Sequence, residues 1–224
     1  SVIQYCNDRN IQISIGHSAA NFEDIKNLKE YGIGGVVHMF SGMKGIHHRE
    51  PGVAGAALYF DDLYCEFAKQ TGITVRHEIF DIAYRIKGAD KIIMTTDCAG
   101  SAKRKEKSYQ YTRQVTYIPQ GDTLRLEYDD GRVEEYDLTN YEDIRKIEMS
   151  YLDSIKNMLK HTPVKLTDLA KITSTNAAIY IGIDDSKGII QAGMDADLTI
   201  LTKDFDLVET VVNGNRVYIN DQEY

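Results

Sequence analysis

Residues 91–97 read Lys-Ile-Ile-Met-Thr-Thr-Asp, an apolar and β-branched run that ends at an acidic residue. Such a run predicts a buried strand that leads directly into Asp97. The preceding stretch, Ile79 to Lys87, has a helical pattern, and Gly88 follows it as a helix stop. A helix followed by a buried strand is the repeating unit of parallel α/β proteins, so this stretch indicates the fold class.

The same alternation runs back to the start of the chain. A helical pattern extends from Asn21 to Tyr31 and stops at Gly32. Other short apolar runs predict strands at residues 11–15, 35–37, 64–68 and 73–75. We therefore predict an α/β fold with parallel strands.

Polar side chains follow three of these strands. His17 and His38 come just after the first two runs, as Asp97 comes after the last. In a closed parallel barrel all such strand ends face one mouth, so we expect the three side chains to converge there. The alternative is structural, because a single histidine after a strand is more often a hydrogen-bonded residue than a ligand.

Two imidazoles and one carboxylate suit hydrolytic chemistry. Imidazole is a good ligand for a divalent metal, zinc or alternatively iron, which lowers the pKa of water enough to supply hydroxide. A carboxylate such as Asp97 can accept a proton from that water and pass it to a leaving amine. The predicted reaction is the hydrolysis of an amide.

The remaining segments change in character. The region 103–139 is rich in tyrosine and charge, and strands at 123–128 and 132–136 flank an Asp-Asp-Gly turn, which predicts a hairpin insertion. Helical patterns follow at 141–160 and 166–180. Short antiparallel strands are predicted at 187–190, 196–201 and 207–218, the last with an Asn213-Gly214 turn.

Composition limits the function classes. The 224 residues are 42% apolar, enough for one core and a small second domain, and the net charge is -8. We expect neither a nucleic acid nor a membrane as a partner, because acids are spread along the chain and no apolar run is long enough to span a bilayer. The three cysteines have no CxxC spacing and no signal peptide is recognisable, so we expect a cytoplasmic setting.

Several motifs carry a family resemblance. They are Gly16-His17-Ser18, His38-Met39-Phe40-Ser41-Gly42-Met43, the run His-His-Arg-Glu-Pro-Gly-Val-Ala-Gly at 47–55, Thr95-Thr96-Asp97, Thr175-Asn176-Ala177-Ala178 and Asp195-Ala196-Asp197-Leu198. In order and separation the first four resemble the second half of the N-acetylglucosamine-6-phosphate deacetylases. The last two resemble the closing segment of the wider amidohydrolase superfamily.

The resemblance implies a fold and an activity. It implies the C-terminal part of a (β/α)8 TIM-type barrel over residues 1–180, with the hairpin inserted around 103–139, followed by strands of a small β-sandwich over 181–224. The implied reaction releases acetate from N-acetylglucosamine 6-phosphate to give glucosamine 6-phosphate, and the implied partner is a second copy in a homodimer.

The resemblance also implies roles for individual residues. His17 and His38 match the two histidine metal ligands, and Asp97 matches the catalytic acid/base. Arg49 matches the arginine that binds the sugar phosphate, commonly from the neighbouring subunit, a task that suits its planar fork of donors. Ser41 and Gly42 occupy the place of substrate-contacting residues.

Some positions leave alternatives open. His48, with His47, either lines the substrate loop or is exposed. Thr74 stands where the family has a substrate-contacting histidine, and the family's third metal ligand, a glutamate, would precede Ser1. The substrate could therefore be a related phosphorylated amide, or the protein could be a non-catalytic sugar-phosphate binder that descends from the enzyme.

Overall fold

A computed structural model gives the fold and describes residues 2–68, 74–97, 100, 104–111, 113–140, 143, 146–147 and 151–220. The chain forms two compact units. The first comprises Ser1–Thr95 and Leu152–Tyr224, and the second comprises Thr96–Tyr151.

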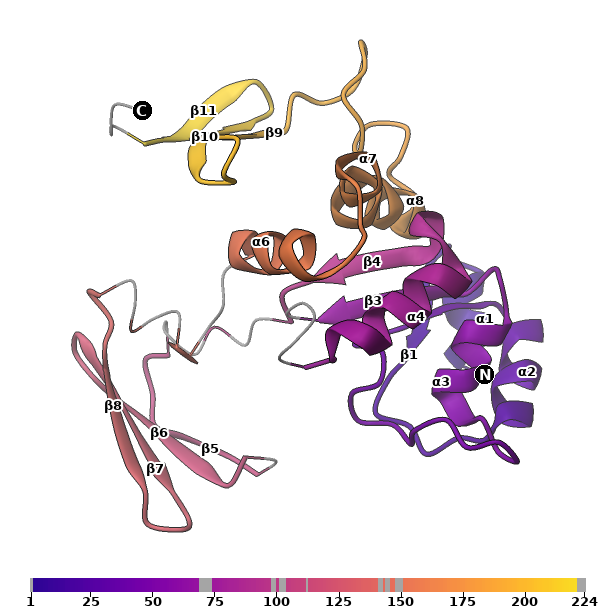
Figure 1. The fold of residues 1–224 in the computed structure, drawn as a ribbon, viewed down its shortest axis with the longest axis horizontal. Coiled ribbons are helices and arrows are strands. Elements are labelled where there is room, and N and C mark those ends of the chain that lie inside the picture. Colours follow the sequence, from indigo (N-terminus) through magenta and orange to yellow (C-terminus); the bar gives the residue numbers. More distant parts are fainter. Residues whose placement is uncertain are drawn as a thin grey trace. The chain divides into compact units, whose positions relative to one another are not determined.

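A four-stranded sheet organises the first unit (Figure 1). Its strands are β1 (Ile13–Ile15), β2 (Ile33–Val36), β3 (Tyr64–Ala68) and β4 (Ile92–Thr95), in that spatial order. All three pairings are parallel, which confirms the predicted arrangement, and β3 has the predicted bounds. Because the strands are parallel, their carboxyl ends lie along one edge of the sheet.

Helices alternate with these strands. They are α1 (Val2–Asn7), α2 (Phe22–Glu30), α3 (Gly52–Tyr59), α4 (His77–Lys87) and the short 3-10 helix η1 (Ala89–Lys91). A reciprocal capping box between Asn21 and Asp24 starts α2, and Gly88, at φ 65°, ends α4. The predicted strand at 73–75 is wrong where it can be seen, because Thr74 and Val75 belong to no strand and residue 73 lies outside the described part.

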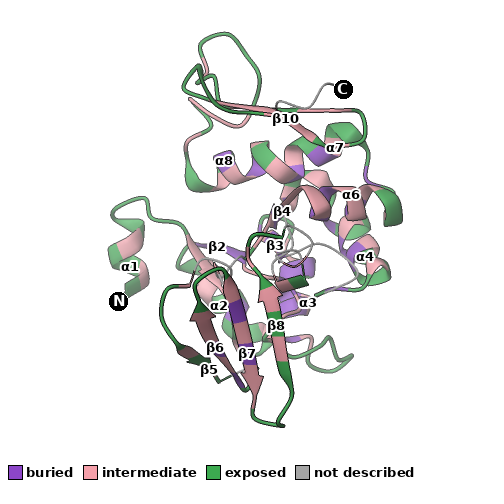
Figure 2. Ribbon diagram, turned by 90° about the vertical axis from the view of Figure 1, so that its left-hand side faces the viewer, coloured by how far each residue is buried: buried purple, intermediate pink, exposed green. Residues whose placement is uncertain are grey.

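One face of the sheet carries the main core. Cys65 and Phe67 of β3 are buried, and the Phe67 ring packs on the ring of Phe80 of α4 with centroids 5.0 Å apart. Figure 2 colours buried stretches purple, and they include much of α3. Side chains alternate between the two faces along a strand, so Glu66, which lies between Cys65 and Phe67, points to the other face.

Three helical segments follow α6 (Tyr151–His161) near the C-terminus. They are α7 (Leu166–Ala170), a π-helical turn (Lys171–Thr175) and α8 (Asn176–Ile181), which follow one another without a break and confirm the helix predicted at 166–180, with a π-helical turn in its middle. Of the helix predicted at 141–160, the part before Tyr151 lies largely outside the described residues. No helix in the described part of the chain is long and apolar enough to cross a bilayer.

The predicted strand at 187–190 is wrong. Gly188 has φ 101°, and its carbonyl oxygen accepts hydrogen bonds from the hydroxyls of Ser174 (3.2 Å) and Thr175 (2.8 Å). This segment is therefore held by side chains of the π-helical turn, and it pairs with no strand in the described structure.

A second, antiparallel sheet ends the first unit. It contains β9 (Leu198–Leu201), β10 (Leu207–Val212) and β11 (Asn215–Ile219), in the order β11-β10-β9. Asn213 and Gly214 form the predicted turn, with φ values of 48° and 76°. That these strands belong to a β-sandwich, and that residue 180 bounds a domain, stay predictions.

The second unit is an antiparallel sheet with its own core. Its strands are β5 (Ser108–Gln110), β6 (Val115–Gln120), β7 (Thr123–Tyr128) and β8 (Val133–Asp137). The predicted hairpin is confirmed, since β7 has the predicted bounds and pairs with β8. The buried side chains are Val115, Tyr117, Leu124 and Leu126.

Candidate active site

The sheet brings two predicted ligands together at its carboxyl edge. His17 lies two residues beyond β1, and His38 lies two residues beyond β2. Their ring centroids are 4.5 Å apart, with the rings edge to face at 78°. Because β1 and β2 are adjacent and parallel, their last residues end side by side, and the two imidazoles meet although they lie far apart in the sequence.

Asp97 occupies the same position relative to its own strand, two residues beyond β4. All three residues have left-handed backbones, with φ of 44° at His17, 32° at His38 and 46° at Asp97. Non-glycine residues rarely adopt this conformation, which costs on the order of 1–3 kcal/mol and is concentrated at functional sites. The side chain of Asp97 is exposed, and its role in proton transfer stays a prediction.

The surroundings of the imidazoles fit part of a metal site. His38 Nδ1 is buried without a hydrogen-bond partner, as expected of a nitrogen that awaits a ligand. A Cβ atom at Gly42 would lie 2.8 Å from His17 Cε1, so only glycine leaves room for that ring. Within the described residues, however, no group of three His, Cys, Asp or Glu side chains could hold a metal. The described residues thus offer two imidazoles in contact, and their binding of a metal stays a prediction.

The loop after β2 forms the wall of a pocket beside His17. The pocket has a volume of about 370 Å³ and is lined by His17, Ser18, Ala19, Gly42, Met43 and Lys44. The backbone N–H of Ser41 donates to the His38 carbonyl oxygen at 2.8 Å, which closes a turn directly after the histidine. Lys44 escaped the sequence analysis, although a cation beside the Ser41-Gly42-Met43 motif was a visible signal for an anionic substrate.

The neighbouring loop contains Arg49, the residue predicted to bind the phosphate of the substrate. Glu50 anchors it, because one carboxylate oxygen accepts from the backbone N–H groups of Phe22 (2.8 Å) and Gly52 (3.0 Å). Arg49 is exposed, and within the described structure its guanidinium forms no ion pair. The rings of His47 and His48 lie 4.3 Å apart, and both residues are exposed.

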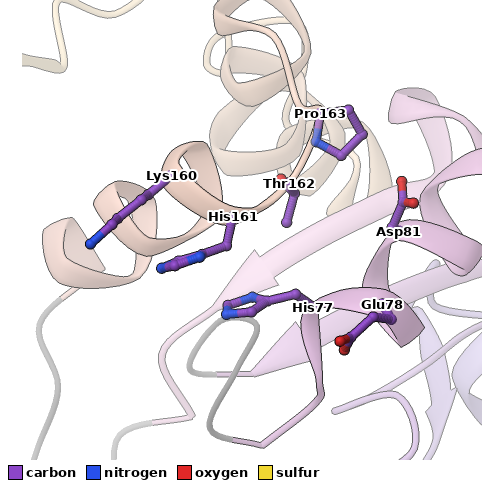
Figure 3. A pocket seen from close by; sticks show the side chains of 7 residues that line it. All are labelled: His77, Glu78, Asp81, Lys160, His161, Thr162 and Pro163. Atoms are coloured by element: carbon purple, nitrogen blue, oxygen red, sulfur yellow. The ribbon is translucent and has the colours of Figure 1, made fainter.

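Thr74 and His77 are both engaged elsewhere. The Thr74 hydroxyl donates to the Ala68 carbonyl oxygen at 2.6 Å. Figure 3 shows His77 turned toward His161, and the two rings are stacked 4.3 Å apart at 15°. They line a pocket of about 540 Å³ that shares no lining residue with the pocket beside His17.

Comparison with known proteins assigns the family. The sequence pattern of the amidohydrolase family matches residues 1–217 of the 224. The chain belongs to the amidohydrolase family. Members of this family generally depend on a divalent metal, in keeping with the paired imidazoles.

Similar proteins of this amidohydrolase family are about twice as long. The chain is 31% identical over 221 residues to the N-acetylglucosamine-6-phosphate deacetylase of Bacillus subtilis (strain 168), covering 99% of this chain and 52% of that protein. It is 23% identical over 215 residues to the N-acetylgalactosamine-6-phosphate deacetylase of Escherichia coli O157:H7, covering 95% and 52%. This amidohydrolase chain therefore spans about half the length of the curated relatives it matches.

A solved structure supports the fold of this amidohydrolase. The crystal structure of N-acetylglucosamine-6-phosphate deacetylase from Thermotoga maritima matches with a TM-score of 0.76 and 27% identity, covering 98% of this chain and 56% of that one. The mixed α/β arrangement is thus shared with that enzyme. The four parallel strands do not show a closed barrel, so the barrel stays a prediction.

Proposed function

We propose that this chain carries half of the active site of a divalent-metal amide hydrolase that releases acetate from N-acetylglucosamine 6-phosphate. The observation that supports the proposal most strongly is the pair of left-handed histidines, His17 and His38, with their rings in contact at the sheet edge. A bound divalent metal, zinc or alternatively iron, would lower the pKa of water and polarise the amide carbonyl.

The chain's own residues then have distinct roles. His17 and His38 would hold the metal through their imidazole nitrogens, and by resemblance to the family a glutamate would be the third protein ligand. Asp97 accepts the proton of the attacking water and donates it to the leaving amine. Arg49 binds the phosphate of the substrate, either within one molecule or from the second copy of a homodimer.

Position 74 gives a reason to test a second substrate. The Thr74 hydroxyl is engaged by the Ala68 carbonyl, and one relative is an N-acetylgalactosamine-6-phosphate deacetylase. Both sugar phosphates should therefore be assayed. The exposed cation of Arg49 favours a phosphorylated substrate over a neutral one, because a guanidinium without an acidic partner in the described structure is available to bind phosphate oxygens.

The test combines metal content with turnover. The full-length product that contains this chain should bind one zinc or iron and release acetate, and Asp97→Asn should abolish release while the metal stays bound. Asp184→Asn, a change at an exposed aspartate, is the matched control and should keep the parent rate. Undiminished turnover in Asp97→Asn would refute the acid/base role, and protein without metal or turnover would favour a sugar-phosphate binder.

A further inference from the structure

Glu66 is an acidic residue in the middle of an otherwise apolar strand. It lies on β3, between buried Cys65 and buried Phe67, and its side chain points to the opposite face of the sheet from theirs. The hydroxyls of Ser14 and Tyr180, 2.5 Å apart, line the same narrow cavity as Glu66. A carboxylate at such a place in a sheet requires a reason, because apolar residues would fill it at lower cost.

The contacts of Glu66 provide that reason. One carboxylate oxygen accepts the backbone N–H of His38 at 3.4 Å, and the Glu66 carbonyl oxygen accepts the backbone N–H of Met39 at 2.6 Å. Two successive amides of the segment that follows β2 are thus held by one residue of the adjacent strand. This is the point at which the backbone turns into the left-handed conformation of His38, at φ 32°.

A strained conformation persists only where its surroundings hold it. A left-handed non-glycine residue costs on the order of 1–3 kcal/mol, and a side-chain oxygen that accepts its backbone N–H limits how that backbone can turn. The Glu66 carboxylate therefore supplies a directed restraint on the backbone of His38. This contact is to the peptide group, and His38 Nδ1 has no hydrogen-bond partner within the described residues.

We propose that Glu66 is a positioning residue that fixes His38 for metal binding. This inference rests on the proposed function, because it assumes that His38 is a ligand. The expected effect is a weaker metal site when the acceptor is removed, by roughly 10- to 100-fold, the usual effect of losing a group that orients a ligand. Glu66→Gln keeps an acceptor oxygen at the same reach, so it should retain most of the affinity.

The experiment measures metal affinity and amide exchange in the full-length product that contains this chain. The metal-free protein is titrated with Co²⁺, followed by the visible absorption of the bound ion, for the parent, Glu66→Ala, Glu66→Gln and the exposed control Glu30→Ala. Hydrogen exchange at the amides of His38 and Met39 is measured without metal, and circular dichroism confirms that each variant is folded. Faster exchange at His38 and lower affinity in Glu66→Ala, with both restored in Glu66→Gln, would support the inference.

Two other results would overturn it. Unchanged Co²⁺ affinity and unchanged exchange in folded Glu66→Ala would show that His38 needs no such restraint. An equal loss of affinity in Glu66→Gln and Glu66→Ala, with normal exchange in Glu66→Gln, would indicate that the charge itself is needed, which a positioning role does not require. Failure of the proposed function gives a different result, because the parent itself would then bind no Co²⁺.

Discussion

Gly42 shows how one missing side chain makes room for a candidate ligand. It has φ 64°, and a Cβ atom there would contact His17 Nδ1 and lie 2.8 Å from Cε1. Gly42→Ala should therefore displace the imidazole and weaken Co²⁺ binding by roughly tenfold or more, as misplaced ligands do. The measurement is a Co²⁺ titration of the folded variant.

The same loop offers the matched control. A Cβ atom at Gly45 would meet no other atom within 4 Å. Gly45→Ala should therefore leave the affinity unchanged and alter the free energy of unfolding by no more than about 0.5 kcal/mol. Equal affinities in both variants would contradict the claim that Gly42 makes room for His17.

Cys65 is not part of the candidate site. Because its side chain is buried, we expect its thiol to react slowly. Burial raises the pKa of its thiol to about 11, while the nearby charge of Lys87 acts in the opposite direction. The thiolate is the reactive form, so little of it exists at about pH 8 in the folded state. In a variant with serine at positions 6 and 98, a chromogenic disulfide should label Cys65 slowly until denaturant is added. Fast labelling of the native protein would show that the site opens readily.

At the scale of elements, Asn176 joins a helix to the sheet. It begins α8, is 2% exposed, and its side-chain amide donates to the carbonyl oxygens of Ala89 (2.6 Å) and Ile92 (2.7 Å). Asn176→Asp replaces the two donors with a buried acceptor, so it should lower the free energy of unfolding by roughly 2–4 kcal/mol. Asn27→Asp adds the same charge on the exposed face of α2 and serves as the control in urea unfolding. A similar small effect in both variants would exclude the helix-to-sheet role.

The elements also show what the sequence could reveal. The run 64–68 is a strand with the predicted bounds because its apolar composition and its length agree. Helix α3 was missed, since most of its residues are buried and it therefore has no polar face to give a period. The strand predicted at 187–190 failed because apolar character alone cannot reveal that Gly188 bonds to hydroxyls 13 and 14 residues away.

The candidate site shows the same limit. His17 and His38 could be paired from the sequence, because each follows a short apolar run and parallel strands end at one edge. Lys44 and Glu66 could not be placed, since their positions depend on how a loop folds back and on which strand lies next to β2. The sequence did show that Glu66 is a single acidic residue within the apolar run 64–68, which sets it apart from its neighbours in that strand.

At the scale of the whole molecule, the first unit presents a sheet with β1 and β4 at its edges. The described sheet does not show what pairs with the edge strands β1 and β4, so the closed barrel stays a prediction. The third metal ligand likewise stays a prediction. A barrel mouth is built from strand ends all around it, so we expect the strands that close the barrel to carry the third ligand as well.

The stability of the molecule should depend on pH through the stacked pair His77 and His161. The pKa of His161 lies below its usual value of 6.5, first because of burial and then because of the positive charges of His77 and Lys160. The folded state therefore disfavours the protonated form, and the unfolded chain binds more protons as the pH falls. This contribution to stability is present above pH 6.5 and is lost as the pH falls through the lowered pKa.

The nearby acids do not reverse this sign. Glu78 and Asp81 line the same pocket, and Arg76 lowers the pKa of Glu78 to about 2, so that carboxylate stays charged from about pH 7 to about pH 5. The unfolding temperature of the parent should therefore fall over this range by more than that of His161→Gln, which removes the titrating ring. His48→Gln, a change in a different loop, should keep the pH dependence of the parent. A His161→Gln curve parallel to the parent would show that the stacked pair does not contribute to acid sensitivity, and that other groups of this acidic chain determine it.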